Sequence, residues 1–170
     1  MSAGAWPLTE TFHPVGTIDS VAAKFRAGVI IVVEHPDGRV LVCERSDVRG
    51  AWQLPQGGID DGEEPVVAAW RELEEETGLT AQEVSLRAVS TTWTMYEFPD
   101  GHRRLKSYLG QVHRWFRFVV RSDEVEPMVD GVEFVDWAWM KPAKLVKNVA
   151  KFRKPGYEAM LLHEEAWRDV

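Results

Sequence analysis

Short runs of apolar and β-branched residues, separated by turn chemistry, fill much of the chain. In several runs apolar and polar side chains alternate, which is the pattern of a strand with one buried face. Pro36, Asp37 and Gly38 stand between the first two runs and predict a hairpin turn. The pattern predicts strands at Phe25–Glu34, 39–45, 51–54, 84–98, 108–120 and 133–140.

Helical periodicity occurs in three further places. Pro65 suits a first helical turn, because its missing N–H has no partner there, and Gly78 supplies a C-terminal stop. We therefore expect a helix at Pro65–Thr77, whose buried face would carry Val66, Ala69, Trp70, Leu73 and Thr77. Two more helices are expected at Pro142–Asn148 and at 155–167, the last with Tyr157, Met160, Leu161 and Trp167 facing inward.

The run at 108–120 alternates over its whole length. One face is predicted to carry Gln111, His113, Trp115 and Arg117, and the other Val112, Arg114, Phe116 and Phe118. Because helices follow the strands at this spacing, the expected fold class is α/β, a central mixed β-sheet sandwiched by helices. Residues 21–170 are expected to form one domain, and residues 1–20, which lack periodicity, an N-terminal arm.

Composition narrows the class of protein. A chain of 170 residues that is 45% hydrophobic and contains eight tryptophans is long and apolar enough for one packed domain. A net charge of −7 argues against general coating of nucleic acid, so no DNA partner is expected. The longest aliphatic run, 29–33, is too short to cross a bilayer, and Cys43 is the only cysteine. We expect a cytoplasmic protein without a membrane partner, as a monomer or a homodimer.

The helix expected at Pro65–Thr77 carries a crowd of carboxylates. Glu72, Glu75 and Glu76 fall on one arc beside the buried face, with Glu76 nearest to it. Glu74 projects to the opposite flank and is expected to bind nothing. Like charges four residues apart repel, and a place near the core adds a desolvation cost. A divalent cation that takes oxygen ligands, such as Mg²⁺, would relieve both.

Two simpler interpretations exist for the glutamates alone. A glutamate-rich run is usually a solvated helix face, and Arg71 could simply pair with Glu75. The spacing of the whole segment 57–79 decides against them. It follows GX5EX7REUXEEXGU, where U is apolar, with Gly57, Glu63, Arg71, Glu72, Leu73, Glu75, Glu76, Gly78 and Leu79 at the fixed positions. This segment resembles the Nudix box at every one of them.

The resemblance extends over about residues 26–157. WQLPQGGID at 52–60, TWTMYEFP at 92–99 and GQVHRWFRF at 110–118 are similar to the Nudix subgroup of bacterial RNA pyrophosphohydrolases and plant-type diadenosine polyphosphate hydrolases. The family implies an α/β/α sandwich that cleaves a diphosphate linked to another moiety. It also implies Mg²⁺ or Mn²⁺ as cofactor.

The resemblance further implies roles for the acidic residues. The metal ligands and catalytic carboxylates would be Glu72, Glu75, Glu76 and the distal Glu133, with the Gly57 carbonyl as backbone ligand. Either Glu76 or Glu133 would accept the proton of the attacking water. Arg71 and Glu63 would orient the carboxylates and hold the loop before the helix.

Substrate contacts are implied in the same way. Arg26 and Arg45 match arginines that hold phosphates, and Phe152 with Arg153 matches an aromatic and basic pair near the first base. Tyr96 is a second stacking candidate. Other interpretations stay open, since Phe152 could be a core residue and Arg26 a charge at a strand edge.

Three positions in the run at 108–120 and Gln56 of the PQGG tetrad complete the expected contacts. The subgroup usually shows GQxQKWF, whereas this chain has His113 in place of the second glutamine and Arg114 in place of the lysine. Arginine keeps the charge but changes its geometry from a point to a fork. Gln111 and His113 share one face, so His113 could reach a phosphate, act as a pH-sensitive acid or be structural.

Three functions are compatible with the sequence. The first is Mg²⁺-dependent cleavage of a nucleotide polyphosphate, either a dinucleoside polyphosphate or the 5′-triphosphate end of an RNA. The second is the same chemistry on a nucleoside triphosphate or a nucleotide sugar. The third is a regulatory module that binds a nucleotide without hydrolysis, and the intact box ranks it last.

Overall fold

The computed structural model describes residues 24–99 and 108–170, so the predicted arm over residues 1–20 lies outside it and stays a prediction. The described strands are β1 (Phe25–Glu34), β2 (Val40–Arg45), β3 (Trp52–Gln53), β4 (Gln56–Gly58), β5 (Val84–Ser90), β6 (Thr94–Glu97), β7 (Gly110–Val120), β8 (Phe134–Met140) and β9 (Trp167–Asp169). The helices are α1 (Pro65–Thr77), α2 (Pro142–Asn148) and α3 (Lys154–Leu161), followed by a 3₁₀ turn at Glu164–Ala166. In this part of the chain no helix has the length and apolar character needed to span a membrane.

All described strands belong to one mixed sheet. Its main path is β3-β2-β1-β7-β5-β9, while β4, β6 and β8 pair with β1, β7 and β2. The central strands β1 and β7 run parallel, with paired positions from Phe25↔Gly110 to Glu34↔Val119. The remaining pairs are antiparallel. The predicted mixed sheet is therefore confirmed.

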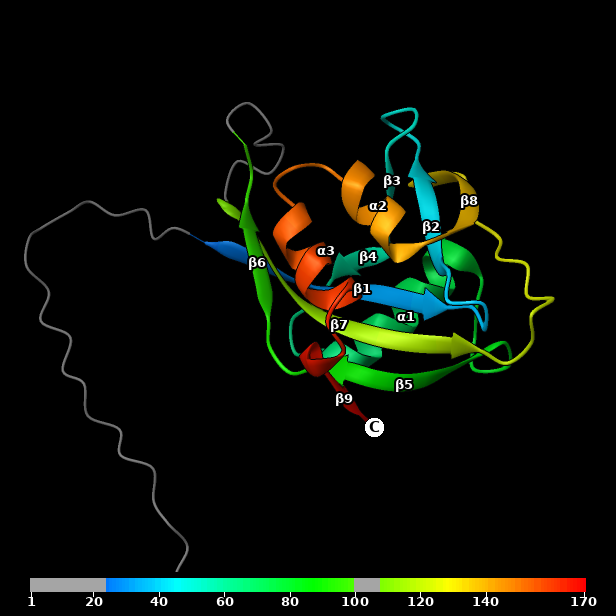
Figure 1. Cartoon of the computed structure of the whole chain (residues 1–170). Helices are drawn as coiled ribbons and strands as arrows, with labels where there is room; N and C mark the ends of the chain where they lie inside the picture. The colour runs from blue at the N-terminus through cyan, green and yellow to red at the C-terminus, as the bar shows by residue number, and fades with distance from the viewer. Residues whose placement is uncertain (1–23, 100–107) are drawn as a thin grey trace, which may run out of the picture.

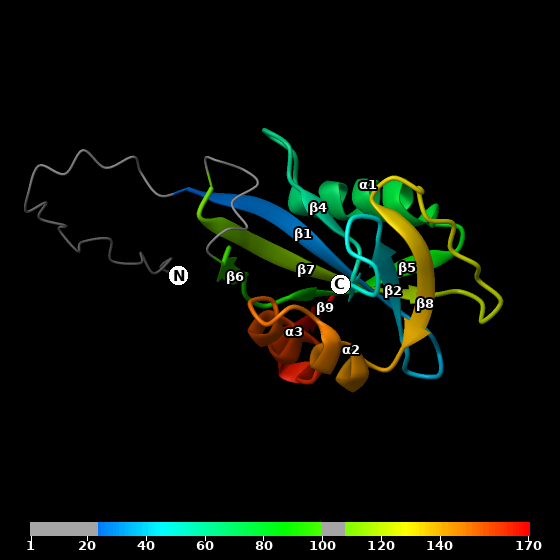
Figure 2. The ribbon, with the colours of Figure 1, turned by 90° about the horizontal axis from the view of Figure 1, so that it is seen from above.

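Helices cover both faces of this sheet, with α1 on one side and α2 and α3 on the other (Figures 1 and 2). Strand β1 divides its side chains between the two layers: Val29 and Ile31 lie in the core under α1, and Ile30 lies in the core under α2 and α3. Strand β7 alternates as predicted, with Phe116 in the first core and Trp115 in the second. The α/β sandwich is therefore confirmed.

Helix α1 has the predicted bounds. Gly78 ends it in the left-handed conformation, with φ 67°, and donates its N–H to the Glu74 carbonyl at 2.9 Å. Most of the predicted face is inside, but Val66 is 37% exposed, so that part of the prediction is wrong. Val66 has almost the same angle around the axis as Leu73, so position along the helix decided its exposure. The buried residues of α1 are Ala68, Ala69, Leu73, Glu76 and Thr77.

Two strand predictions differ from the structure. The run at 84–98 is two strands, β5 and β6, which pair with successive parts of the same edge of β7. The chain turns between them, where Ser90 Oγ donates to the Thr92 carbonyl at 2.8 Å and accepts from Trp115 N–H at 3.1 Å. Strand β4 was not expected, because its sequence QGG has low β propensity. It forms because β1 offers it a pairing edge.

The predicted terminal helix at 155–167 is wrong beyond Leu161. The chain there forms the 3₁₀ turn and then β9, which pairs with β5. Arg117 provides the reason: its guanidinium carbon lies 4.2 Å from the Trp167 ring centroid, and its Nη1 donates to Glu164 at 2.6 Å. These long-range contacts override the local helical pattern. Trp167 does pack inward, as predicted, but from a strand.

Candidate active site

Glu76 projects from α1 toward the short strand β4, and its side chain is only 3% exposed. Its Oε2 accepts a hydrogen bond from the Gln56 backbone N–H at 2.9 Å, whereas its Oε1 is buried with no partner among the described residues. Burial, and next the negative charge of Glu133, raises the pKa of Glu76 to about 10. A buried carboxylate oxygen without a partner is a position that a bound cation would satisfy.

Arg71 ties the loop before α1 to the helix. Its Nε and Nη2 donate to the two carboxylate oxygens of Glu63 at 2.9 and 2.8 Å, and its Nη1 donates to Glu72 at 2.8 Å. Nη2 also donates to the Gly58 carbonyl at 2.9 Å. Hydrogen bonding from Arg71 lowers the pKa of Glu63 to about 2. The bond to Glu75 is longer, at 3.3 Å, so a simple pair of Arg71 with Glu75 describes this site poorly.

Gly57 lets the Glu72 carboxylate lie against the β4 backbone. A Cβ built on Gly57 would be 1.8 Å from the Glu72 Cδ and 2.0 and 2.1 Å from its two oxygens. Burial raises the pKa of Glu72, and the hydrogen bond from Arg71 opposes that rise. Glu72 is therefore positioned by the missing side chain of residue 57 on one side and by Arg71 on the other.

The backbone of β4 turns the carbonyls of Gln56 and Gly57 to opposite edges. In an extended strand, the N–H and C=O of one residue point to the same edge. The Gln56 N–H donates to Glu76, so the Gln56 carbonyl also points toward the edge where Glu76 lies. Gly57 pairs with Val29 of β1, and its oxygen lies 2.6 Å from the place of a Cβ on Gly28. This geometry disfavours the predicted carbonyl ligand at Gly57 and favours one at Gln56.

Glu133 immediately precedes β8 and is held by its main chain. The N–H groups of residues 132–134 donate to the Asp130 carboxylate at 3.0 Å, and the Glu133 carbonyl accepts from the Ser46 N–H at 2.9 Å. Burial raises the pKa of Glu133, and the negative charge of Glu72 raises it further. The distal glutamate thus lies within electrostatic reach of the α1 carboxylates, although it is 57 positions or more away in sequence.

These carboxylates suit a hard divalent cation by their chemistry, but their side chains do not form a closed cage. Within the described part of the chain, no three carboxylate, imidazole or thiol groups lie close enough together to hold a metal ion. Arg71 hydrogen-bonds both Glu72 and Glu75, and Glu133 is repelled by Glu72. The unpaired Oε1 of Glu76 and an all-oxygen donor set match the preferences of Mg²⁺. A bound cation would have to draw the carboxylates together.

Several predicted substrate contacts gather on the face of the sheet that α2 and α3 cover. Arg153 is 8% exposed, and its Nη1 donates to Gln56 Oε1. Its guanidinium carbon lies 5.4 Å from the Tyr96 ring centroid and 5.6 Å from that of Phe152. The two rings are 5.0 Å apart. The structure therefore brings together four residues from three distant segments of the chain.

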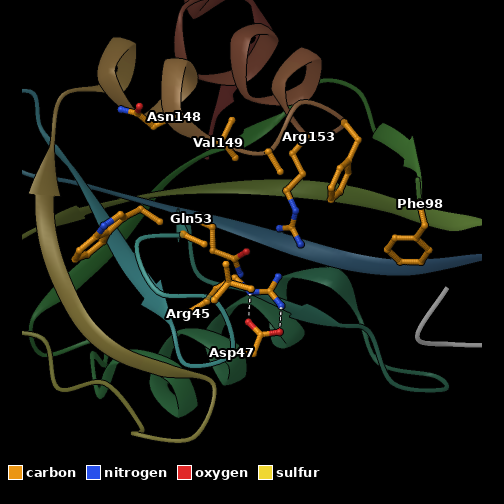
Figure 3. A pocket seen from close by; sticks show the side chains of 12 residues that line it. Arg45, Asp47, Gln53, Phe98, Asn148, Val149 and Arg153 are labelled. Carbon is orange, nitrogen blue, oxygen red and sulfur yellow. Dashed lines mark hydrogen bonds and ion pairs between the residues drawn. The ribbon is translucent and has the colours of Figure 1, made fainter. Parts of the chain in front are cut away.

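A pocket of about 330 Å³ opens beside this group (Figure 3). Its wall includes the rings of Trp52, Phe98 and Phe152, the guanidinium groups of Arg45 and Arg153, and the amides of Gln53 and Asn148. Figure 3 shows Arg153 extending into the space between Phe98 and Gln53, and Arg45 paired with Asp47. The Arg45–Asp47 pair has two hydrogen bonds of 2.7 Å. Aromatic rings with nearby cations suit a flat ligand that carries negative charge.

His113 and Gln111 lie beside Tyr96. The His113 ring stacks on Tyr96 with 5.4 Å between centroids, and Gln111 accepts a hydrogen bond from the Tyr96 hydroxyl. His113 is 1% exposed, and its Nδ1 has no partner among the described residues. Burial, with the charges of Arg153 and Arg26, lowers the pKa of His113 to about 3. A histidine that is neutral near pH 7 does not fit the role of a pH-sensitive acid.

The two remaining arginines differ in their places. Arg26 lies over Gly58, where a Cβ would be 2.3 Å from its Nη2, and its charge acts on Glu72. Arg114 lies on the opposite face of β7, with its guanidinium carbon 5.9 Å from the Trp93 ring centroid. The structure therefore places Arg26 beside β4, with its charge acting on both Glu72 and His113, but does not place Arg114 with the group around Arg153.

Sequence reasoning missed part of the pocket and the support of Glu133. Trp52 and Phe98 lie within the motifs at 52–60 and 92–99, and this is the only sequence signal that points to them. Asn148 ends α2, and no spacing links it to the other two. Asp130 acts through main-chain N–H groups, a contact that residue types do not reveal.

A family model described as NUDIX domain matches residues 24–160 of the chain. Nudix hydrolase 26, chloroplastic, of Arabidopsis thaliana is 35% identical over 156 residues, which cover 85% of this chain and 71% of that protein. An RNA pyrophosphohydrolase of Ruthia magnifica subsp. Calyptogena magnifica is 40% identical over 143 residues, which cover 81% of this chain and 79% of that protein.

Solved structures are similar in fold at low sequence identity. The dihydroneopterin triphosphate pyrophosphohydrolase of E. coli has a TM-score of 0.65 and 19% identity, covering 81% of this chain and 97% of that chain. A binary complex of a C. elegans Ap4A hydrolase has a TM-score of 0.61 and 17% identity, covering 78% and 93%. At such identities these structures support the fold alone.

Replacing Gly57 with alanine should displace the Glu72 carboxylate, because the new Cβ would lie 1.8 Å from the Glu72 Cδ. We expect the affinity for Mn²⁺, measured by isothermal titration calorimetry, to fall about tenfold or more. Gly156→Ala is the matched control, because a Cβ there meets its nearest atoms at 3.4 Å. It should bind Mn²⁺ as the wild type does, and equal affinities for the two variants would contradict the positioning of Glu72.

The raised pKa of Glu76 also predicts a pH dependence of stability in EDTA. Its folded pKa of about 10 lies above the unfolded value of about 4.3, so its contribution is complete below pH ~4 and is lost as pH rises toward 10. Urea unfolding from pH 5 to about 9 should therefore show wild type losing stability relative to Glu76→Gln, which cannot ionise. Parallel stability curves for the two proteins would show that Glu76 titrates normally.

Proposed function

The chain belongs to the Nudix family, and on this basis we propose that it is a divalent-cation-dependent pyrophosphohydrolase that cleaves a phosphoanhydride bond of a nucleotide polyphosphate. One observation carries the proposal. The buried Oε1 of Glu76 lacks a partner, and the Gln56 that hydrogen-bonds the other oxygen also binds Arg153 in the wall of the aromatic pocket. Gln56 therefore links a carboxylate that a cation would stabilise to an aromatic pocket that could hold a nucleobase.

Glu72, Glu75, Glu76 and Glu133 would hold Mg²⁺ or Mn²⁺, with the Gln56 carbonyl as backbone ligand in place of the predicted Gly57. When bound, the cation supplies a Lewis acid that neutralises charge on the phosphate oxygens and lowers the pKa of the attacking water. Arg71 serves this site by holding Glu72 at 2.8 Å and by fixing the loop through Glu63. Three glutamates of one helix leave one side of a cation open, and Glu133 approaches from another element.

Either Glu76 or Glu133 would accept the proton of the attacking water. Burial raises the pKa of both groups, and a raised pKa makes a carboxylate a stronger proton acceptor. The oxygen of the water bonds to phosphorus, the proton goes to the glutamate, and the bridging oxygen leaves with the other phosphate. The fixed main chain of Glu133 and the buried stem of Glu76 keep both candidates in place for this transfer.

The pocket would hold one nucleobase. Stacking of a base on a ring such as Phe152 is worth roughly 1–3 kcal/mol. Arg153 would bridge base and phosphates, because it lines the pocket and its charge also acts on Glu133. Arg45 and Arg26 would bind phosphate oxygens, which would compete with Asp47 for Arg45.

For the substrate we propose a dinucleoside polyphosphate or the 5′-triphosphate end of an RNA. The support is the likeness to a protein named RNA pyrophosphohydrolase and the three motifs at 52–60, 92–99 and 110–118. A nucleoside triphosphate or nucleotide sugar is the second candidate, because the spacing at 57–79 indicates the diphosphate chemistry without selecting the rest of the substrate. A cytoplasmic location, and a monomer or homodimer, belong to the same proposal.

A product assay tests the activity and the substrate together. The protein with Mg²⁺ is incubated separately with diadenosine tetraphosphate, triphosphorylated RNA, the nucleoside triphosphates and ADP-ribose, and products are identified by mass spectrometry. We expect cleavage between phosphates, with kcat/KM highest for diadenosine tetraphosphate or the RNA. A protein that hydrolyses none of these compounds would refute the proposed function, and a preference for ADP-ribose would move it to the second candidate.

Glu76→Gln should lower turnover by about a hundredfold or more, because the variant loses both a cation ligand and a proton acceptor. Glu74→Gln is the matched control, since Glu74 is exposed on the same helix, and it should keep wild-type turnover. Thermal melts of both variants check folding. Near-normal turnover of a folded Glu76→Gln protein would remove Glu76 from the mechanism.

A further inference from the structure

Gln56 was expected to touch substrate, but its side chain has little surface left for that. The residue is 9% exposed, and its Oε1 is occupied by the Arg153 guanidinium. The neighbouring Tyr96 gives its hydroxyl hydrogen to Gln111, and its ring centroid lies 5.4 Å from the Arg153 guanidinium carbon. The acceptor oxygen of the amide is therefore committed to Arg153.

The hydrogen bond to Gln56 restricts the side-chain conformation of Arg153. Arg153 directly precedes α3, and it lies against the rings of Tyr96 and Phe152 at 5.4 and 5.6 Å. A long guanidinium side chain has several rotamers, so an acceptor at its end selects one of them. With Gln56 in place, Arg153 lines the pocket, and its charge also acts on Glu133.

The main chain of the same residue contacts Glu76 of α1, the helix that covers the other face of the sheet (Figure 2). Gln56 N–H donates to Glu76 Oε2 at 2.9 Å, which is the only partner that the described residues give to this carboxylate. Strand β4 is anchored to β1 by the register Ile30↔Gln56. One residue on a fixed strand thus contacts both the arginine of the pocket and the buried glutamate.

We propose that Gln56 is a positioning residue: its amide fixes Arg153 for the nucleotide, while its backbone fixes Glu76 for the cation. This inference rests on the proposed function, because it assigns the pocket to a nucleotide. It differs from the earlier expectation, since Gln56 acts through its neighbours and does not contact the substrate. Substitution of its side chain weakens nucleotide binding and leaves the contact between the backbone and Glu76 intact.

The test is a double-mutant cycle on nucleotide binding in EDTA. Gln56→Met, Arg153→Met and the double variant are titrated calorimetrically with a non-hydrolysable nucleoside triphosphate analogue. A hydrogen bond to a charged group predicts that Gln56→Met weakens binding about ten- to hundredfold. In the Arg153→Met background, Gln56→Met should change Kd by less than about threefold, because its main partner is already gone.

Steady-state kinetics adds a second readout. With the best substrate of the product assay, Gln56→Met should raise KM by the same factor as Kd, and kcat should stay within about threefold of wild type. The exposed Gln82 provides a matched control, and Gln82→Met should alter neither constant. If the factors by which Gln56→Met and Arg153→Met raise Kd multiply in the double variant, Gln56 binds the substrate directly. If Gln56→Met lowers only kcat, Gln56 takes a direct part in the reaction. Either result overturns the inference.

Two safeguards keep the test decisive. If thermal melting shows that Gln56→Met does not fold, Gln56→Asn replaces it in the cycle, because a shorter amide also loses the reach to Arg153. The cycle is measured in EDTA, so its outcome does not depend on hydrolysis. A wild-type protein that binds the analogue but cleaves no polyphosphate would refute the proposed function and leave the role of Gln56 to be judged by the cycle.

Discussion

The burial of one carboxylate is the constraint on which the site depends. Glu76 is carried into the protein by the packing of α1 on the sheet, and it retains a single hydrogen bond. Taking an ionised carboxylate out of water without a countercharge costs several kcal/mol. Without a cation, burial raises the pKa of Glu76, so the carboxyl group stays protonated and neutral. The fold therefore keeps a group whose ionised form is stable only in the company of positive charge, which is the property expected of a cation site.

Strand β4 shows how a small element can serve two sites. Its successive side-chain positions face opposite sides of the sheet, so Gln56 meets Arg153 under α2 and α3 while Gly57 makes room for Glu72 under α1. In the proposed function, the residues for the cation and those for the nucleobase would thus lie on different faces of the sheet and share one backbone. This division explains why a tight glycine and a buried amide stand side by side in the PQGG tetrad.

Local signals in the sequence were enough for α1, the central strands and the layered α/β class. They were not enough for the C-terminal segment, where the contact of Arg117 with Trp167 replaces a helix by β9. In the site, the spacing of the box located the α1 glutamates, because one helix fixes their relative places. The wall of the pocket and the support of Glu133 could not be located this way, since distant loops and main-chain groups build them.

The final strand has a consequence for behaviour at high concentration. Strand β5 would otherwise present its outer N–H and C=O groups to the solvent, where sheets of separate molecules can join edge to edge and aggregate. β9 occupies that edge over three residues, and two of them, Arg168 and Asp169, are exposed charges. A strand this short and this charged is a poor template for another chain. The tail that Arg117 holds in place thereby covers the Ala88–Ser90 part of this edge against edge-to-edge pairing.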